Sequence, residues 1–365
     1  MEAFRPKIAL LMALILMNFQ TPSSAGEFTS LYAFGDGVCT TTGNVTTGSL
    51  SSLYYGKRYC NGRVWIEILA RWQGLAYAGA NNISYFGHDS GELLTNISNF
   101  TAPSDINTAL VVVWCNNADL VEFTQTNAPP YTNSDKTAWT TFIDQAVTRH
   151  TQAVTRLYNK GVRTLVMPNS VNIAATPYYN LNSTDASFLR QRAIQYNTAF
   201  SAAMTSLAAS KSGLRIFQPD TFSFFEQVLA TPSDYGLVNP GIDAITNLGT
   251  PSLTGPGASY VFWDYIHPTA KFQIHLANLV QNQILPVKVD AITSNGTSTQ
   301  LQISNVPLGL DGVVEGSASL TSWQKDVDLS YPVGAGNSTT KVVTVPTTGP
   351  KRFYRVAFPV VWTWP

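Results

Sequence analysis

The chain has 365 residues, and its 22 lysines and arginines balance its 22 aspartates and glutamates, so the formal net charge at pH 7 is zero. A nucleic-acid-binding protein normally carries an excess of basic charge on one face, so this balance argues against that class. Apolar residues make up 44% of the sequence, which is ample for a core and excludes a wholly disordered chain. With 3 cysteines and 4 histidines, the chain is too poor in ligands for a multi-cysteine zinc module or a dense disulfide framework.

The first 25 residues have the features of a signal peptide. Arg5 and Lys7 precede an apolar run over residues 8–17, and small residues at 23–25 form a cleavage site. The run is too short to cross a bilayer, which needs about twenty residues. No later apolar run approaches that length. We therefore expect removal of residues 1–25 and a secreted, periplasmic or extracellular chain without a membrane span.

The next part of the chain alternates short β-rich runs with longer amphipathic stretches. The expected strands are 30–34, 83–86, 109–115, 163–168 and 214–218, and the expected helices are 63–73, 90–100, 136–160, 185–210 and 268–284. This alternation predicts an α/β fold with an open parallel sheet and helices on both faces. Asp89 and Glu92 predict a capping box for the second helix. Pro268 is expected in the first turn of the last helix, where its missing N–H does no harm.

After Pro286 the pattern changes to short strand-like runs separated by Gly, Asn, Ser and Pro clusters. The runs are 288–292, 300–303, 312–315, 341–345 and 353–357. They predict a small antiparallel β-sandwich. The expected organisation after the leader is therefore an α/β domain over residues 26–286 and an all-β accessory domain over residues 287–365.

Two segments of this last region, Gly312–Trp323 and Arg352–Val356, loosely resemble a small β-sandwich that is appended to many exported bacterial proteins. The resemblance implies an accessory role, either structural or in surface binding. Carbohydrate binding is a further alternative, because exposed and buried aromatic residues cannot be distinguished in the sequence.

Polar turns follow the predicted strands or precede the last helix at four places. The turns are Phe34-Gly35-Asp36-Gly37, Asn82–Asp89, Trp114–Asp119 and Phe262–Thr269. Ligands of open parallel sheets bind beyond the carboxyl ends of the strands. We therefore expect the four turns to meet at one edge of the sheet and to form the functional site.

In this order, the four turns resemble those of the SGNH/GDSL hydrolases, a family that includes secreted esterases and lipases. The resemblance covers roughly residues 30–286, including Tyr55–Leu69. It implies an SGNH-type, flavodoxin-like three-layer α/β/α fold that hydrolyses lipid, aryl or acetylated-carbohydrate esters without a cofactor or metal. In Asp264-Tyr-Ile-His267 it assigns the orienting carboxylate and the base. Gly87 matches a residue of the oxyanion hole.

The sequence departs from the family pattern in two of these turns. Gly37 stands where the family has its serine nucleophile, and Ala118 stands at the asparagine of the oxyanion hole, although Asp119 is retained. If the loop is shifted by one residue, Asn116 or Asn117 could take the place of that asparagine. A covalent acyl intermediate needs a hydroxyl or thiol beside the base, so the family's standard mechanism cannot run through position 37.

Three replacements for the missing nucleophile remain open. Cys39 could present a thiolate, although it could equally pair with Cys60 or stay a buried thiol, and the odd count that includes Cys115 leaves one cysteine unpaired. The hydroxyls of residues 40–42 are a second source. Alternatively, His267 could activate a water molecule in the room left by the absent serine.

The sequence therefore supports two main hypotheses. One is a GDSL-type ester hydrolase with a non-standard or lost nucleophile, and the other is a catalytically inactive SGNH-fold protein that binds an acylated or carbohydrate ligand. An adhesion or matrix role for the β-sandwich is a third. His88 and Asp89, beside Asp36, Asp119 and Asp264–His267, could bind a metal through imidazole and carboxylate ligands, although bracing of adjacent turns by hydrogen bonds is the favoured interpretation.

Overall fold

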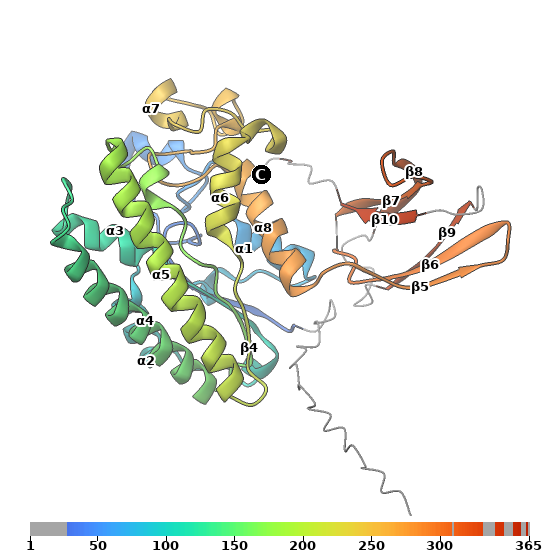
Figure 1. Ribbon diagram of the computed structural model, residues 1–365, viewed down its shortest axis with the longest axis horizontal. Helices are drawn as coiled ribbons and strands as arrows, with labels where there is room; N and C mark the ends of the chain where they lie inside the picture. Colours follow the sequence, from blue (N-terminus) through green and yellow to red (C-terminus); the bar gives the residue numbers. More distant parts are fainter. Residues whose placement is uncertain (1–27, 309, 331–339, 347–352, 359–362, 364–365) are drawn as a thin grey trace, which may run out of the picture.

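The computed structural model describes residues 28–308, 310–330, 340–346, 353–358 and 363 (Figure 1). The predicted signal peptide lies outside these residues. Within the described part of the chain, no helix is both long and apolar enough to cross a membrane.

A four-stranded parallel sheet forms the centre of the larger part of the chain. Its spatial order is β1 (Leu31–Gly35), β2 (Leu110–Trp114), β3 (Thr164–Val166) and β4 (Arg215–Phe217). The strand predicted at 83–86 is wrong, because an isolated bridge between Ala33 and Asn82 is formed on the free side of β1 instead. The chain turns at Phe86 and Gly87, so this segment is too short for a ladder.

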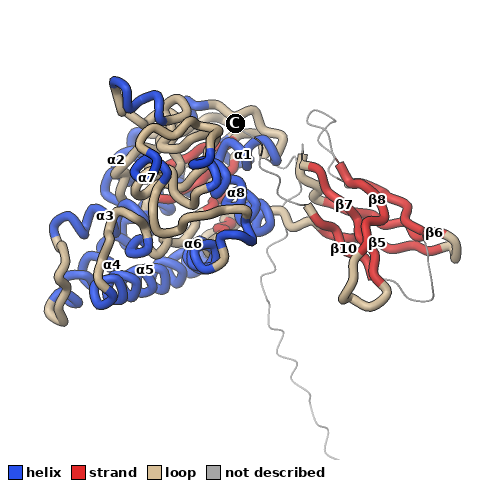
Figure 2. The backbone as a smooth tube through the Cα atoms, turned by 90° about the horizontal axis from the view of Figure 1, so that it is seen from above, coloured by secondary structure: helices blue, strands red, loops and turns tan. Residues whose placement is uncertain are grey.

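Helices cover both faces of this sheet (Figures 1 and 2). One apolar cluster joins the sheet to α1 (Trp65–Trp72), α6 (Thr221–Ala230) and α8 (Ala270–Ile284). The other joins it to α2 (Ser90–Asn99), α3 (Asn116–Thr126), α4 (Asp135–Asn159) and α5 (Ser183–Ser210). Alternate residues of β2 enter the two clusters, as the pleat of a strand buried on both sides requires. The predicted three-layer α/β/α architecture is confirmed.

The predicted helices α1, α2, α4 and α5 lie within two residues of their expected bounds. The last helix, α8, begins at Ala270 because the Thr269 hydroxyl accepts a hydrogen bond from the Phe272 N–H and caps it, so Pro268 lies outside the first turn. The Asp89 carboxylate caps α2. The reciprocal contact of a capping box is found instead at α1, where Glu67 accepts from the Val64 N–H.

Several elements were not predicted from the sequence, among them the strand β8 (Gln324–Ser330) of the all-β region. Besides β8, α3 and α6, they are α7 (Ala244–Leu248) and the 3-10 helices η1 (Gly48–Leu53), η2 (Gly79–Asn81), η3 (Ile106–Thr108), η4 (Ile173–Ala175), η5 (Pro232–Tyr235) and η6 (Pro256–Ser259).

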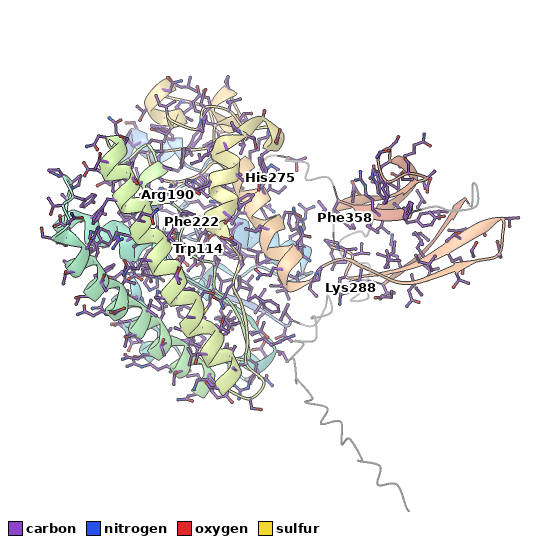
Figure 3. All side chains as sticks on the ribbon, viewed as in Figure 1. Trp114, Arg190, Phe222, His275, Lys288 and Phe358 are labelled. Atoms are coloured by element: carbon purple, nitrogen blue, oxygen red, sulfur yellow. The ribbon has the colours of Figure 1, made fainter. Side chains whose placement is uncertain are left out.

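The region after residue 287 consists of two antiparallel sheets, which confirms the predicted small all-β region. One sheet has the order β10 (Phe353–Ala357), β7 (Asp311–Ser317), β8 (Gln324–Ser330), and the other has the order β5 (Lys288–Ser294), β6 (Ser298–Ser304), β9 (Lys341–Pro346). They share an apolar cluster, against which Phe358 packs (Figure 3). Phe358 also packs against the cluster that contains α1 and α8. The domain boundaries given above remain a prediction.

Candidate active site

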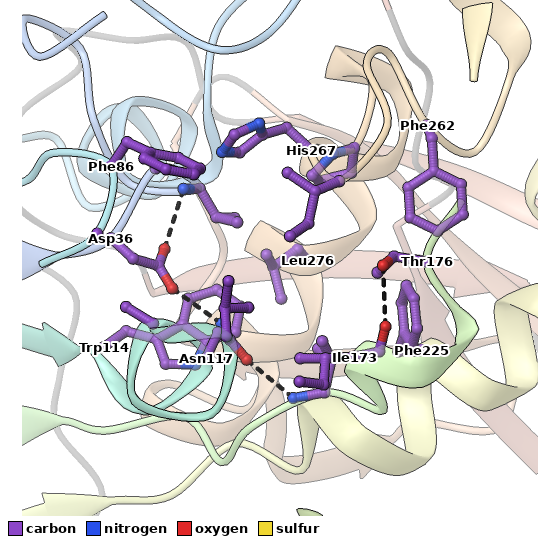
Figure 4. A pocket seen from close by; sticks show the side chains of 18 of the residues that line it. Asp36, Phe86, Trp114, Asn117, Ile173, Thr176, Phe225, Phe262, His267 and Leu276 are labelled. Carbon is purple, nitrogen blue, oxygen red and sulfur yellow. Dashed lines mark hydrogen bonds between the residues drawn. The ribbon is translucent and has the colours of Figure 1, made fainter. Parts of the chain in front are cut away.

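All four predicted polar turns line one cavity at the carboxyl end of the sheet (Figure 4). The turn after β1 contributes Gly37, the second contributes Gly87, the third contributes Asn117 and the last contributes His267. The expectation that these turns meet is therefore met. The topology explains it, because parallel strands end at the same edge of a sheet.

Asp264 and His267 form an assembled dyad in the last turn. His267 Nδ1 lies 2.9 Å from Asp264 Oδ1, and the His267 N–H donates to the same oxygen at 2.8 Å. Burial acts to raise the pKa of Asp264, but the charge and hydrogen bonds of His267 outweigh it and hold this pKa below its ordinary value. The Tyr54 hydroxyl donates to Asp264 Oδ2 at 3.1 Å. With Nδ1–H directed at the carboxylate, Nε2 is the free basic nitrogen of the ring.

The imidazole of His267 occupies the space that a side chain at position 37 would need. A Cβ built on Gly37 would lie 2.2 Å from His267 Nε2. The Tyr59 ring stacks on the imidazole with centroids 4.7 Å apart, and the Phe86 ring meets it edge-on at 5.8 Å. The expectation that the absent serine leaves room for a water is therefore wrong, since the ring itself fills that room.

The side chains proposed as replacement nucleophiles are turned away from the cavity. Cys39 is fully buried in the core beside α1, and burial raises the pKa of its thiol well above the ordinary value. Cys39, Cys60 and Cys115 are all free, buried thiols. The Thr40 hydroxyl accepts from the Gly43 N–H, as expected of a turn residue. None of these groups lines the cavity.

Asn117, rather than Asn116, reaches the cavity from the third turn. Its Nδ2 donates to Asp36 Oδ2 at 3.1 Å, and its Oδ1 accepts from the Val171 N–H at 3.0 Å (Figure 4). Asn116 is buried and donates to the Pro168 carbonyl. The methyl group of Ala118 lines the cavity. Gly87 also lines it, with a φ of +79° that favours glycine.

Asp36 is a buried carboxylate at the floor of the first turn. Its Oδ1 accepts from the Val38 N–H at 3.0 Å. Burial raises the pKa of Asp36 to about 6, although the hydrogen bonds from Val38 and Asn117 act in the opposite direction. Asp36 therefore binds its proton more tightly in the folded chain than in the unfolded chain.

We expect this difference to appear in the pH dependence of stability. The contribution of Asp36 is full below its ordinary pKa of 3.8 and is lost as the pH rises through about 6. The loss should reach about 3 kcal/mol of unfolding free energy at neutral pH. Urea unfolding measures this loss in the wild type against Asp36→Asn, which cannot ionise. The unfolding free energy of the wild type minus that of the variant should fall from about pH 4 to pH 7. A constant difference would contradict this assignment.

A second buried network lies beneath the third turn. Asp119 Oδ2 lies 3.1 Å from His150 Nε2 and accepts from the Tyr196 hydroxyl at 2.6 Å, while Oδ1 accepts from the Ser90 N–H. The sequence did not indicate a role for His150, because it lies in the middle of α4 and its partner Asp119 belongs to α3. This network fixes α3, α4, α5 and the start of α2 relative to one another.

His88 braces adjacent turns, as the favoured interpretation of the sequence has it. Its Nδ1 lies 3.0 Å from the Gly35 carbonyl, and its Nε2 lies 3.1 Å from Asn96 Nδ2. Burial lowers the pKa of His88 to about 4, so the ring is neutral at pH 7. Within the described ranges, no three His, Cys, Asp or Glu residues are grouped as metal ligands would be.

Most of the remaining cavity wall is apolar. It is formed by α3, α6, α8 and the segments beside them. Its apolar members include Ile173, Phe225, Phe262 and Leu276 (Figure 4). Val121 and Phe272 also line it. The cavity volume is about 70 Å³. Sequence analysis did not predict this wall, because its members come from separate segments, including the unpredicted helix α6, that only the fold brings together. The titratable side chains among the lining residues are the carboxyl groups of Asp36 and Glu122 and the imidazole of His267.

The family model of GDSL-like lipases and acylhydrolases matches residues 31–280. The chain belongs to this family. It is 26% identical over 148 residues to one GDSL esterase/lipase of Arabidopsis thaliana and 25% identical over 151 residues to another. These matches cover 37% of this chain and 38% and 41% of the two relatives, so the chain aligns with about two fifths of their length.

Two solved structures are also similar to this GDSL-family chain. A lipase from a goat rumen metagenome has 10% identity and a TM-score of 0.40, covering 70% of this chain and 97% of that chain. An acetyl xylan esterase has 10% identity and a TM-score of 0.36, covering 68% of this chain and 96% of that chain.

Proposed function

We propose that this GDSL-family chain binds an ester through an apolar acyl group and that it lacks the covalent route of hydrolysis. The observation that carries the proposal is the position of His267 Nε2, 2.2 Å from where a Cβ at Gly37 would stand. The base is present, but the space for its nucleophile is filled. A signal peptide at residues 1–25 would place this activity outside the cytoplasm.

The wall of the cavity favours an acyl chain over a sugar as the group that enters it. A sugar ring needs several hydrogen-bonding partners when it is buried, because each unpaired hydroxyl costs free energy. The wall offers mostly aliphatic and aromatic side chains, among them Val121, Phe225 and Leu276. Each buried methylene contributes about 0.8 kcal/mol, so an acyl chain gains affinity with length until the cavity is full. The alcohol part of the ester, lipid or carbohydrate, lies outside the cavity.

Hydrolysis by a water molecule is a second candidate function, and the assembled dyad favours it. Asp264 orients His267, and Tyr54 supports the carboxylate, so Nε2 is a competent base. The imidazole must first withdraw from Gly37 to admit a water. This route gives an activity that disappears in His267→Ala and leaves no acyl group on the protein.

Binding can be tested without hydrolysis by using methyl alkyl ketones, which resemble esters but cannot be cleaved. Titration calorimetry of the wild type should show affinity rising about threefold to fourfold per methylene over the shorter ketones. Val121→Trp, which fills the cavity from α3, should weaken binding of the longer ketones at least tenfold. Val342→Trp on exposed β9 is the matched control and should bind as the wild type does. Equal affinity for all chain lengths would contradict the proposal.

A further inference from the structure

Basic residues are unevenly distributed in the first third of the described chain. Between residues 28 and 135 the only lysines and arginines are Lys57, Arg58, Arg63 and Arg71. They fall within 15 positions of a chain in which only 12% of residues are charged. Three of the four, the arginines, line one groove beside α1. This groove shares no lining residue with the cavity at Gly37.

The groove is a concave surface with a volume of about 530 Å³. Tyr55 and Tyr77 lie along it, and Glu67 is its only acidic lining residue. Arg58 binds Glu67 through two hydrogen bonds, from Nε at 2.7 Å and from Nη2 at 2.6 Å. The Glu67 carboxylate is therefore neutralised by Arg58, and it also accepts from the backbone at the start of α1.

Arg63 and Arg71 carry the remaining charge of the groove. Among the residues that the structure describes, no ion pair joins either guanidinium to a carboxylate. Arg71 is exposed and Arg63 is half-buried. The groove thus has two uncompensated positive charges, next to a third guanidinium that Glu67 holds in place.

We propose that this groove binds a small ligand through an oxyanion, that is a phosphate, sulfate or carboxylate group, held by Arg63 and Arg71. The planar fork of a guanidinium matches the paired oxygens of such groups. The immobilised Arg58 stays in place on binding, which reduces the entropy lost when the ligand is held. A long polyanion such as nucleic acid is a poor fit, because the net charge of the chain is zero and the basic patch is confined to one groove. This inference does not depend on the proposed ester binding.

Calorimetric titration of the full chain tests the groove, with sodium phosphate, sodium sulfate, glucuronate and uncharged glucose compared at constant ionic strength. We expect saturable binding of at least one oxyanion and none of glucose. Arg63→Gln/Arg71→Gln should weaken that binding at least tenfold. The control Lys136→Gln/Arg149→Gln removes the same charge from α4 and should leave the affinity unchanged.

The lysine variant separates the charge of the two arginines from the shape of their guanidinium groups. Arg63→Lys/Arg71→Lys keeps the charge but loses the fork, so its affinity should lie between those of the wild type and the glutamine variant. It also serves as the readout if the glutamine variant does not fold. Equal weakening in the α4 control, binding of glucose as tight as that of glucuronate, or no saturable binding of any oxyanion would overturn the proposal.

Discussion

Gly37→Ser is expected to give the chain covalent ester hydrolysis. The new hydroxyl would stand beside His267, which Asp264 already orients. Loss of a catalytic serine costs a serine hydrolase about 10⁶-fold in kcat. The family resemblance places Ala118 at the position of the oxyanion-hole asparagine, and absence of one such donor costs about 10²–10³-fold. We therefore expect Gly37→Ser to hydrolyse p-nitrophenyl esters about a thousandfold faster than the wild type.

The same substitution should also cost stability. The Cβ displaces the His267 ring, which Tyr59 and Phe86 pack against, and overpacking of this kind typically costs about 1–3 kcal/mol. Intact-protein mass spectrometry should detect an acyl adduct on Gly37→Ser. Gly37→Ser/His267→Ala is the control. It should show neither the acyl adduct nor the increased rate of p-nitrophenyl ester hydrolysis. A folded Gly37→Ser protein as slow as the wild type would show that the imidazole cannot withdraw.

Asp119→Ala is expected to produce the largest loss of stability. Asp119 is 1% exposed, and its removal leaves three buried donors, on Ser90, His150 and Tyr196, without their acceptor. Removal of one partner from a buried ionic network costs about 3–5 kcal/mol. Urea unfolding followed by circular dichroism measures this loss. Asp144→Ala, which removes an exposed carboxylate from α4, should change the unfolding free energy by less than about 0.5 kcal/mol.

The pH dependence of Asp119→Asn provides a second measurement of the same network. Burial acts to raise the pKa of Asp119, but the hydrogen bonds and charge of His150, with those of Tyr196 and Ser90, hold it below its ordinary value. The stabilisation by Asp119 is therefore present above about pH 4 and lost as the pH falls through the folded pKa. The difference in unfolding free energy between the wild type and Asp119→Asn, an advantage of the wild type at neutral pH, should shrink in that acidic range. An advantage that persists there would contradict the assignment.

Apolar patterning was sufficient to predict most of the layered fold. The run Leu110–Trp114 is apolar without interruption, which is typical of a strand buried on both faces, and β2 is such a strand. The long helices α4 and α5 were predicted for a different reason, because their buried residues recur every three or four positions, as on one face of a helix. The edge segment after Asn82 was misread, because alternation shows that a segment can pair but not how many residues pair before the chain turns.

The start of α3 shows why part of the site could not be predicted. Asn116 and Asn117 resemble a polar turn in the sequence, since asparagine favours turns. In the structure they are the first helical residues, and their amides bind Pro168, Val171 and Asp36 across the sheet edge. Such contacts join residues more than 50 positions apart and leave no local signal.

The sequence shows a glycine at position 37, where the resemblance expects a serine, but it does not show what occupies the space of the missing side chain. In the sequence alone, a missing side chain suggests an empty space that a water molecule can enter. The position of His267 depends on the packing of Tyr59 and Phe86, which come from two other segments. Only the folded arrangement shows that the base itself fills the space.

Incubation of the wild-type protein with p-nitrophenyl octanoate, followed by rapid gel filtration, tests the central claim most directly. Chromatography and mass spectrometry then identify what has eluted with the protein. We predict intact ester, bound without a covalent adduct. Recovery of nitrophenol and octanoate instead, formed at a rate that His267→Ala abolishes, would contradict the claim and establish the chain as a working hydrolase.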